Sequence, residues 1–482
     1  MVSGPVSEEL NFVLIPLLAA SHIIPMVDMA KLLAQRGVTV TLVMTPLNAI
    51  RFTAVIDRVI GSGLLIRVLE LQFPAKEAGL PEGCESADVL PALAFRRNFF
   101  AAVDMLQDQA ENLLEEMKPK PSCIICDTHI AWIAETADKF QIPRIIFDGM
   151  SCFTQLCMHN LYIMKDQNKI PESGIFVIPD LPDRIEVTKA QLPGAFNPGT
   201  LCIQDIRDKI RAAEERAYGV VNYGRVWCIG PLSICNNDNL DKSQRGNKAS
   251  FHKEDSLIKW LDSWQPESVV YACLGSLGCI AVVQFVELAL GLEDSGYPFI
   301  LVIKAGEGQA PIEDWISKNG FEKRTKERGL LIRGWAPKVL ILSHPAIGGF
   351  LTHCDWNSTL EGIAAGVPVI TWPLFSEQFL NERYLVHVLK MGVSVGSQGV
   401  MHLGEEKKPE VQVNKEEVTK AIKKVMMGKE KEINDRRKRA KELGQIAEKA
   451  VEIDGSSHLT LTLLIRSGKR ADRVGYGSVE NG

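Results

Sequence analysis

The sequence predicts an α/β protein made of two doubly wound domains, each with a parallel sheet covered by helices. Apolar, strand-like runs alternate with helix-like segments in both halves of the chain, as in βαβ proteins. A polar stretch from Ser233 to Ser250 contains almost no core residues and separates the two halves. The length of 482 residues is enough for two or three domains with large cores.

The first half of the chain begins with a strand, a helix and a second strand. Pro25 suits the first turn of a helix that runs to Arg36, and Gly37 suits its C-terminal cap. A further helix is expected from about Ala131 to Phe140. The strands expected in this half are Asn11 to Leu18, Val38 to Met44, Ser122 to Cys126 and Arg144 to Phe147.

The same alternation resumes after the polar stretch. A helix is expected from Val282 to Leu292, and a capping box of Asn414 and Glu417 predicts another, followed by a long charged helix. The strands expected here are Val269 to Leu274, Phe299 to Ile303, Ile347 to Thr352 and Val367 to Trp372. We therefore expect an N-terminal domain at residues 1–240, a C-terminal domain at residues 241–465 and a frayed tail at residues 466–482.

The composition is that of an ordinary globular protein and disfavours several other classes. Hydrophobic residues make up 46% of the chain and charged residues 23%. The net charge of -5 disfavours general nucleic-acid binding. Pro16, His22 and Pro25 interrupt the apolar stretch near the N-terminus, so no integral membrane segment is expected. Eleven cysteines lack metal-type pairing and the CxxC of Cys123 and Cys126 lies in an apolar run, so we expect buried thiols and a cytoplasmic location.

The most informative stretch runs from Trp335 to Gln378. Its first apolar run, Ile347 to Thr352, breaks at His353 and leads through a polar turn into a helix. A strand, a polar turn and a helix N-terminus form an arrangement that binds phosphate, because unpaired backbone N–H groups and the helix dipole point at the ligand. The side chains of His353, Asn357 and Ser358 stand where they can add hydrogen bonds.

This stretch resembles the signature of plant UDP-dependent glycosyltransferases, and the resemblance extends more thinly over nearly the whole chain. The residues that carry the match, without gaps, are Trp335-Ala336-Pro337, His353-Cys354, Trp356-Asn357-Ser358, Glu361 and Glu377-Gln378. The resemblance implies the GT-B fold, in which two Rossmann-like domains face each other across a cleft. It also implies that the N-terminal domain mainly binds the acceptor and the C-terminal domain binds the nucleotide sugar.

The resemblance assigns the nucleoside of a UDP-sugar to four positions. Trp335 would stack on uracil and Ala336 would offer backbone hydrogen bonds, although the local pattern alone suits a core tryptophan equally well. Lys338 stands where the family usually has a glutamine that helps to hold the nucleoside. Glu361 would accept hydrogen bonds from the ribose hydroxyls, with a first-turn glutamate that satisfies the helix dipole as the alternative.

The resemblance also implies which residues contact the diphosphate and the sugar. The residues expected to contact them are Ser276, His353, Trp356, Asn357, Ser358, Glu377 and Gln378. Simple N-capping is a compatible alternative for Asn357 and Ser358. Glu377 and Gln378 resemble the family's sugar-binding pair, and the terminal glutamine indicates UDP-glucose as the donor.

His22 is the expected catalytic base. It follows the first strand, at the edge of the sheet where doubly wound folds form ligand clefts, and a neutral imidazole there can take the proton of an acceptor hydroxyl. Asp127, at a strand end, corresponds to the family's carboxylate that orients this base and stabilises its imidazolium, with a helix N-cap as the alternative. His129 is interpreted as pocket lining.

The predicted reaction is a single in-line displacement that inverts the anomeric carbon of the sugar. No metal is expected, because the helix N-terminus and His353 can carry the diphosphate charge, and Asp238 and Asp241 have the wrong spacing for a DxD pair. The expected partners are a UDP-sugar and a small lipophilic acceptor, such as a flavonoid or other phenolic, a terpenoid or a steroid. The segment Leu90 to Phe100 either lines the acceptor pocket or packs in the core.

Four departures from the family pattern bear on activity. Asp355 replaces a glycine, which puts a carboxylate near the diphosphate at a cost of roughly 1 to 3 kcal/mol and removes glycine's backbone freedom. Lys338 replaces a glutamine, Ser21 stands where a glycine is common, and a segment near Asn222 is missing. These departures motivate an alternative, an impaired relative that binds a UDP-sugar or a lipophile without turnover. A nicotinamide dehydrogenase is disfavoured, because no GxGxxG follows the first strand.

Overall fold

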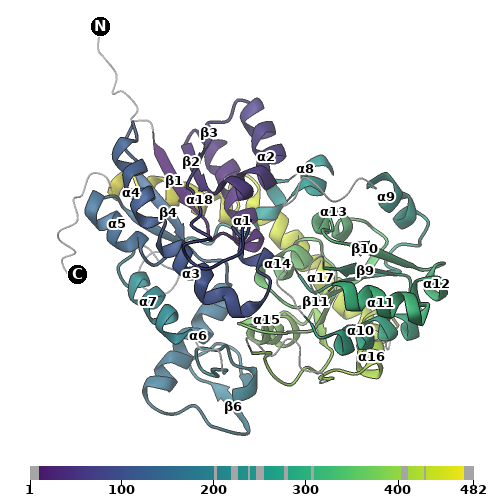
Figure 1. Cartoon of the computed structure of the whole chain (residues 1–482). Coiled ribbons are helices and arrows are strands. Elements are labelled where there is room, and N and C mark those ends of the chain that lie inside the picture. Colours follow the sequence, from purple (N-terminus) through teal and green to yellow (C-terminus); the bar gives the residue numbers. More distant parts are fainter. Residues whose placement is uncertain are drawn as a thin grey trace.

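Two parallel sheets, each covered by helices, form the molecule in this computed structural model (Figure 1). The structure describes residues 10–199, 203–218, 226–236, 239–245, 254–275, 280–304, 309–402, 411–427 and 430–471. The first sheet has five strands in the order β3-β2-β1-β4-β5, and the second has six in the order β10-β9-β8-β11-β12-β13. The predicted α/β fold with two Rossmann-like domains is therefore confirmed.

The strands are short and apolar, and the central ones are buried on both faces, as parallel sheets require. The strands of the first sheet are β1 (Asn11–Ile15), β2 (Thr39–Met44), β3 (Ile66–Glu70), β4 (Cys123–Asp127) and β5 (Arg144–Phe147). Those of the second are β8 (Val269–Cys273), β9 (Phe299–Ile303), β10 (Gly329–Arg333), β11 (Ile347–Thr352), β12 (Val369–Thr371) and β13 (Gly392–Ser394). An antiparallel hairpin, β6 (Ile175–Ile178) and β7 (Ile185–Thr188), extends the first domain. Cys123 and Cys126 are buried in β4, as predicted.

Helices connect the strands and cover both sheets. The α-helices of the first half are α1 (Ala20–Ala34), α2 (Pro46–Gly61), α3 (Arg96–Asp104), α4 (Gln107–Glu116), α5 (Ile133–Phe140), α6 (Cys152–Asp166) and α7 (Gln204–Glu214). Those that follow are α8 (Asn239–Gln244), α9 (Glu254–Asp262), α10 (Val282–Ser295), α11 (Gln309–Asn319), α12 (Phe321–Thr325), α13 (Lys338–Leu342), α14 (Trp356–Ala364), α15 (Gln378–Arg383), α16 (Lys415–Met426), α17 (Glu430–Val451) and α18 (Ser456–Ala471). Single turns lie at Ala87–Val89, Leu93–Phe95, Lys189–Gln191, Leu232–Cys235 and Tyr384–Val388. The capping box predicted at Asn414 and Glu417 begins α16.

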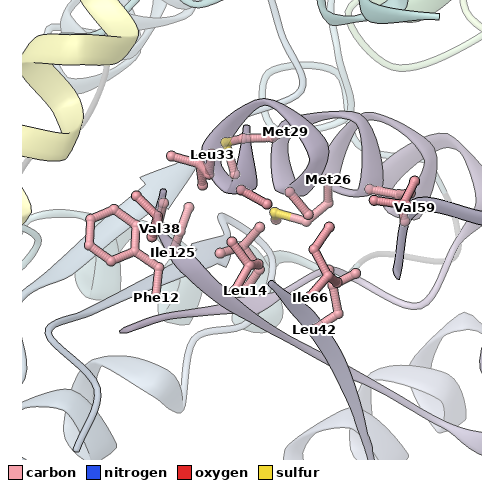
Figure 2. Close-up of a cluster of buried hydrophobic side chains, with 14 of the residues drawn as sticks. Phe12, Leu14, Met26, Met29, Leu33, Val38, Leu42, Val59, Ile66 and Ile125 are labelled. Carbon is pink, nitrogen blue, oxygen red and sulfur yellow. The ribbon is translucent and has the colours of Figure 1, made fainter. Parts of the chain in front are cut away.

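The core of the first domain fixes the helix that carries His22. Met26, Met29 and Leu33 of α1 pack on Phe12 and Leu14 of β1, and all five are fully or almost fully buried (Figure 2). The helix begins at Ala20, five residues before the predicted start at Pro25. Its first turn therefore contains His22, which the sequence placed in the loop before the helix.

The C-terminal helix α18 returns to the first domain, where its yellow ribbon lies behind β1 in Figure 1. Leu461 and Leu464 belong to the same core as β1, and the Cα of Gly468 lies so close to Phe12 that a larger side chain would collide with its ring. The predicted frayed tail is thus wrong for residues 466–471, which continue the helix. The docking of α18 could not be predicted, because the amphipathic pattern of a helix does not show which domain its apolar face packs on.

Replacing Leu461 by Ala is expected to destabilise the protein by about 2 to 4 kcal/mol, because Leu461 is 2% exposed and its removal leaves a cavity in the core. Urea unfolding measures the change. Leu459→Ala, in the same helix but 49% exposed, is the matched control and should change the free energy of unfolding by less than about 0.5 kcal/mol. Equal effects of the two substitutions would show that α18 does not dock on this core.

Candidate active site

A cavity of about 440 Å³ lies between the two domains and is lined by both. The first domain contributes, among others, Ser21, His22, Phe99, Phe100, His129, Met158 and Tyr162. The second contributes His353, Asp355, Trp356, Asn357, Glu377 and Gln378. The segment Leu90 to Phe100 thus reaches the cavity through two of its phenylalanines. Six of the residues predicted for catalysis, diphosphate or sugar binding meet at this one place.

His22 and Asp127 form a short hydrogen bond at the edge of the first sheet. The Nδ1 of His22 is 2.6 Å from Oδ2 of Asp127, and this pairing follows from the fold because β1 and β4 are parallel neighbours. Burial alone would raise the pKa of Asp127, but the imidazoles of His22 and His129 outweigh it and hold the pKa well below its usual range. Asp127 is therefore a carboxylate that keeps a proton on Nδ1 of His22 and leaves Nε2 as the acceptor. It is not an N-cap, since α5 begins at Ile133.

A second imidazole shares the Asp127 carboxylate. The Nδ1 of His129 lies 2.9 Å from Oδ1 of Asp127, and the backbone N–H of His129 donates to the same oxygen at 3.0 Å. The rings of His22 and His129 meet edge to face with centroids 5.3 Å apart. The sequence assigned His129 to the pocket wall only; its place two residues after Asp127 was the signal for this additional contact.

The first turns of α1 and α14 touch across the domain interface. Pro25 has no N–H, so the carbonyl of Ser21, four residues earlier in α1, has no helical donor. The side-chain amide of Asn357 donates to this carbonyl at 2.5 Å. A proline inside a helix thus provides the acceptor that joins the helix of His22 to the helix of Asn357.

Asp355 is the N-cap of α14. Its side chain accepts the backbone N–H of Ser358 at 3.3 Å, and its φ of -62° and ψ of 151° are ordinary for any residue. The expectation that this position needs the freedom of glycine is therefore wrong; Cys354, with φ 67°, has the left-handed backbone. Burial raises the pKa of Asp355, but His353 and Lys338 outweigh it and lower the pKa below its usual value.

His353 lies beside the turn that precedes the N-terminus of α14. It is 3% exposed, and burial lowers its pKa, so the ring is neutral near pH 7. Its Nδ1 has no hydrogen-bond partner among the described residues, and its Nε2 is 3.4 Å from Oδ1 of Asp355. Gly275 lets the ring fit, because a Cβ at this position would collide with it.

Glu377 and Gln378 lie at the same cavity with different environments. The Oε1 of Gln378 accepts the backbone N–H groups of Leu374 and Phe375 at 2.9 and 3.1 Å, so its oxygen braces the loop before α15. Burial raises the pKa of Glu377. Asn381 of α15, which the sequence did not single out, supports the turn before α14: its amide donates to the carbonyl of Cys354 at 2.9 Å.

The predicted nucleoside residues do not line the cavity. They are Trp335, Ala336, Lys338 and Glu361; Ser358, which was predicted for the diphosphate, is also absent from the lining. The Nζ of Lys338 donates to Oγ of Ser358 at 2.6 Å and is 2.9 Å from Oε2 of Glu361. The other carboxylate oxygen of Glu361 pairs with Arg245. Burial raises the pKa of Glu361, but Lys338 and Arg245 outweigh it and lower the pKa.

Arg245 belongs to the polar stretch between the domains, and this stretch is more buried than predicted. Its Nε is 2.8 Å from Oδ2 of Asp28 in α1, so the guanidinium bridges α1 and α14. Asp241 pairs with Lys31 at 2.8 Å and with Arg58 at 3.1 Å. Paired charges therefore hold this linker against the two domains, in place of the apolar side chains that the sequence lacks.

Three features noted in the sequence fall outside the described residues. They are Ser276, Asp238 and the segment near Asn222.

Comparison with known proteins decides the family. A model described as "UDP-glucoronosyl and UDP-glucosyl transferase" matches residues 249–432. UDP-glycosyltransferase 73C3 of Arabidopsis thaliana is 49% identical over 95% of this chain and 96% of its own length. The chain belongs to the plant UDP-glycosyltransferase family. A second relative of this glycosyltransferase, UDP-glycosyltransferase 73C11 of Barbarea vulgaris, is 47% identical with the same coverage.

Solved structures have the same fold as this glycosyltransferase. UGT73P12 of Glycyrrhiza uralensis, complexed with glycyrrhetinic acid 3-O-monoglucuronide, superposes with a TM-score of 0.87 at 35% identity and covers 96% of each chain. UGT2 of Phytolacca americana, complexed with UDP-2fluoro-glucose and pterostilbene, has a TM-score of 0.71 at 25% identity over 96% of this chain and 100% of that one. These matches establish the GT-B architecture. In the part of the chain that the structure describes, no helix is both long and apolar enough to cross a bilayer.

Replacing Glu361 by Gln is expected to destabilise the glycosyltransferase by about 3 kcal/mol, because Lys338 and Arg245 would lose a buried counter-charge. Since the folded pKa of Glu361 is depressed, its contribution is present at neutral pH and is lost as pH falls. The difference between variant and wild type should therefore shrink below about pH 4.

Urea unfolding at several pH values tests this expectation. Asp314→Asn is the control, because it removes one partner of an exposed pair with Lys318 and should cost less than about 0.5 kcal/mol. A loss of the same small size in Glu361→Gln would contradict the buried-pair interpretation.

Proposed function

We propose that this enzyme transfers glucose from UDP-glucose to a hydroxyl of a small lipophilic acceptor, with inversion at the anomeric carbon. The observation that carries the proposal is the position of two groups on one cavity. The His22–Asp127 pair lines it from the first domain, and the N-terminus of α14 lines it from the second. A base and an anion-binding helix end facing one space are what an in-line sugar transfer requires.

His22 acts as the general base. Its Nδ1 proton points to Asp127, so Nε2 can accept the proton of an attacking hydroxyl. The resulting imidazolium is stabilised by a carboxylate that is 1% exposed and stays ionised. Binding the acceptor in the same cavity holds its hydroxyl in position for the attack, so the step no longer depends on a chance encounter.

The second domain stabilises the leaving UDP. The backbone N–H groups at the start of α14 and the side-chain amide of Asn357 stand where a diphosphate would accept hydrogen bonds. His353 would add a hydrogen bond when its Nδ1, which has no partner among the described residues, carries the ring proton. Glu377 and Gln378 would bind the glucose hydroxyls. We propose that this set carries the diphosphate charge without a metal ion, with Ser276 as a further ligand.

Uridine would occupy the region of Trp335, Ala336, Lys338 and Glu361. Ser358 and Glu361 are engaged with Lys338 in this structure, so the donor must rearrange these contacts when it binds. Lys338 lies close enough to α14 to attract a phosphate in place of the family's glutamine.

The acceptor side of the cavity is largely apolar. Phe99, Phe100, Met158 and Tyr162 form a wall beside His22. A relative with 35% identity was crystallised with glycyrrhetinic acid 3-O-monoglucuronide and another with pterostilbene, one large and one small lipophilic compound. We therefore propose the first domain, residues 1–240, as the acceptor domain and residues 241–465 as the donor domain. Flavonoids, other phenolics, terpenoids and steroids are the acceptors to test.

The alternative of an impaired binding protein gains no support. Asp355 has an ordinary backbone, caps α14 and has two positive or proton-donating neighbours, Lys338 and His353. A cytoplasmic location is proposed from the abundance of thiols in the sequence.

A mass-spectrometric screen with UDP-glucose and a panel of acceptors tests the function. Wild type should form a product that is one hexose heavier, and His22→Ala should lower kcat by about 10² to 10⁴-fold, the usual contribution of a general base. The Kd for UDP, measured by calorimetry, should stay within about twofold in this variant, since His22 lies in the other domain. UDP binding without product across the panel would reject the proposal, as would full activity of His22→Ala.

The charge of Asp355 can be tested without removing its cap. Asp355→Asn keeps an oxygen that can accept the N–H of Ser358, so thermal stability should change little. Loss of a carboxylate near the diphosphate should tighten UDP binding by roughly fivefold, equivalent to about 1 kcal/mol after compensation by His353 and Lys338. Unchanged calorimetric affinity would show that these neighbours already cancel the repulsion.

A further inference from the structure

The carboxylate of Asp127 accepts hydrogen bonds from two histidines. Its Oδ2 lies 2.6 Å from Nδ1 of His22, and its Oδ1 lies 2.9 Å from Nδ1 of His129 and 3.0 Å from the backbone N of His129. Both rings line the cavity, and Asp127 itself has no exposed side-chain surface. The two histidines are therefore coupled through one buried carboxylate.

His129 stands among acidic groups from several elements. Asp127 ends β4, Asp148 follows β5, and Glu214 belongs to α7. Enclosure lowers the pKa of His129, but the hydrogen bond to Asp127 and the charges of these three carboxylates outweigh it and raise the pKa. Burial raises the pKa of Glu377, from the second domain, and the charge of His129 acts in the opposite direction. His22 in α1, with its ring centroid 5.3 Å away, is a neighbouring group that can become a cation.

We propose that His129 is a positioning residue that aims the Asp127 carboxylate at His22 and couples the two histidines through it. This proposal rests on the proposed function, in which His22 removes the acceptor proton. It does not require His129 to touch the acceptor.

The first effect is geometric. A buried carboxylate with one oxygen unpaired can rotate or take up a proton. Two donors from His129 hold Oδ1, so Oδ2 remains directed at Nδ1 of His22. This fixes the tautomer of His22 whose Nε2 can accept a proton.

The second effect is electrostatic, and its sign is fixed by the arrangement. When His129 is protonated, its positive charge offsets Asp127 and opposes a second positive charge on His22. Activity should then persist to a lower pH than it would beside a lone carboxylate. Without the charge of His129, the acid limb of the kcat profile should move to higher pH by about 0.5 to 1 pH unit.

A simple wall residue would behave differently. His159 provides the comparison, because it is a histidine that lines the same cavity from α6. Its replacement can change acceptor KM but should leave the acid limb where it is. The pH profile therefore separates a residue that acts through Asp127 from one that shapes the pocket.

The experiment compares wild type with His129→Gln, His129→Leu and His159→Gln, using an acceptor found in the screen. His129→Gln can still donate to Oδ1, so its plateau kcat should stay within about twofold while the acid limb moves to higher pH. His129→Leu should show the same direction of shift with a plateau kcat about tenfold lower, the loss expected for one hydrogen bond to a charged group. The KM for UDP-glucose should be unchanged in all three variants.

A spectroscopic readout keeps the test independent of turnover. Wild type should show two far-downfield proton resonances from imidazole N–H groups bound to Asp127; His129→Gln should lose one and His22→Gln the other. An unmoved acid limb in His129→Gln, or a single downfield resonance in wild type, would overturn the proposal. Failure of wild type to form product in the screen would reject the proposed function. The resonances would still show whether both histidines donate to Asp127.

Discussion

The two domains meet at the site through a hydrogen bond from the side-chain amide of Asn357 to the carbonyl of Ser21. Pro25 leaves this carbonyl available, because it has no N–H to donate to it. The two residues lie in the first turns of α1 and α14, so the contact joins the two helix starts directly. The wider interface contains further contacts, such as the apolar cluster shared by Leu161 and Leu380.

Charge pairs extend this connection deeper into the interface. Asp28, one helical turn beyond Pro25, meets Arg245 from the linker, and Arg245 meets Glu361. Lys338 completes the group and also holds Ser358. An intact buried pair of this kind adds little net stability, but removing one partner is strongly destabilising because the other charge stays buried. As a result, the first domain, the linker and α14 share one cluster of paired charges.

Much of the fold could be predicted from sequence, because parallel strands are continuous apolar runs and helix ends have local signals. Asn414 and Glu417 show this at the start of α16. The start of α1 was misplaced because Pro25 suits both a first turn and an interior position where another group uses the released carbonyl. The meeting of His22 and Asp127 was expected from the family resemblance. The contact of His129 and the insertion of Arg245 were not, since both depend on pairings between segments far apart in the sequence.

Helix α18 has a consequence for the engineering of this enzyme. Its leucines pack under β1, so the chain passes from one domain to the other twice. A chimera that exchanges first domains at the linker alone would separate β1 from the helix that supports it. The exchanged unit must instead comprise two pieces, the N-terminal half together with residues 456–471 of the same parent. The first domain is thus built from two separate segments of the sequence.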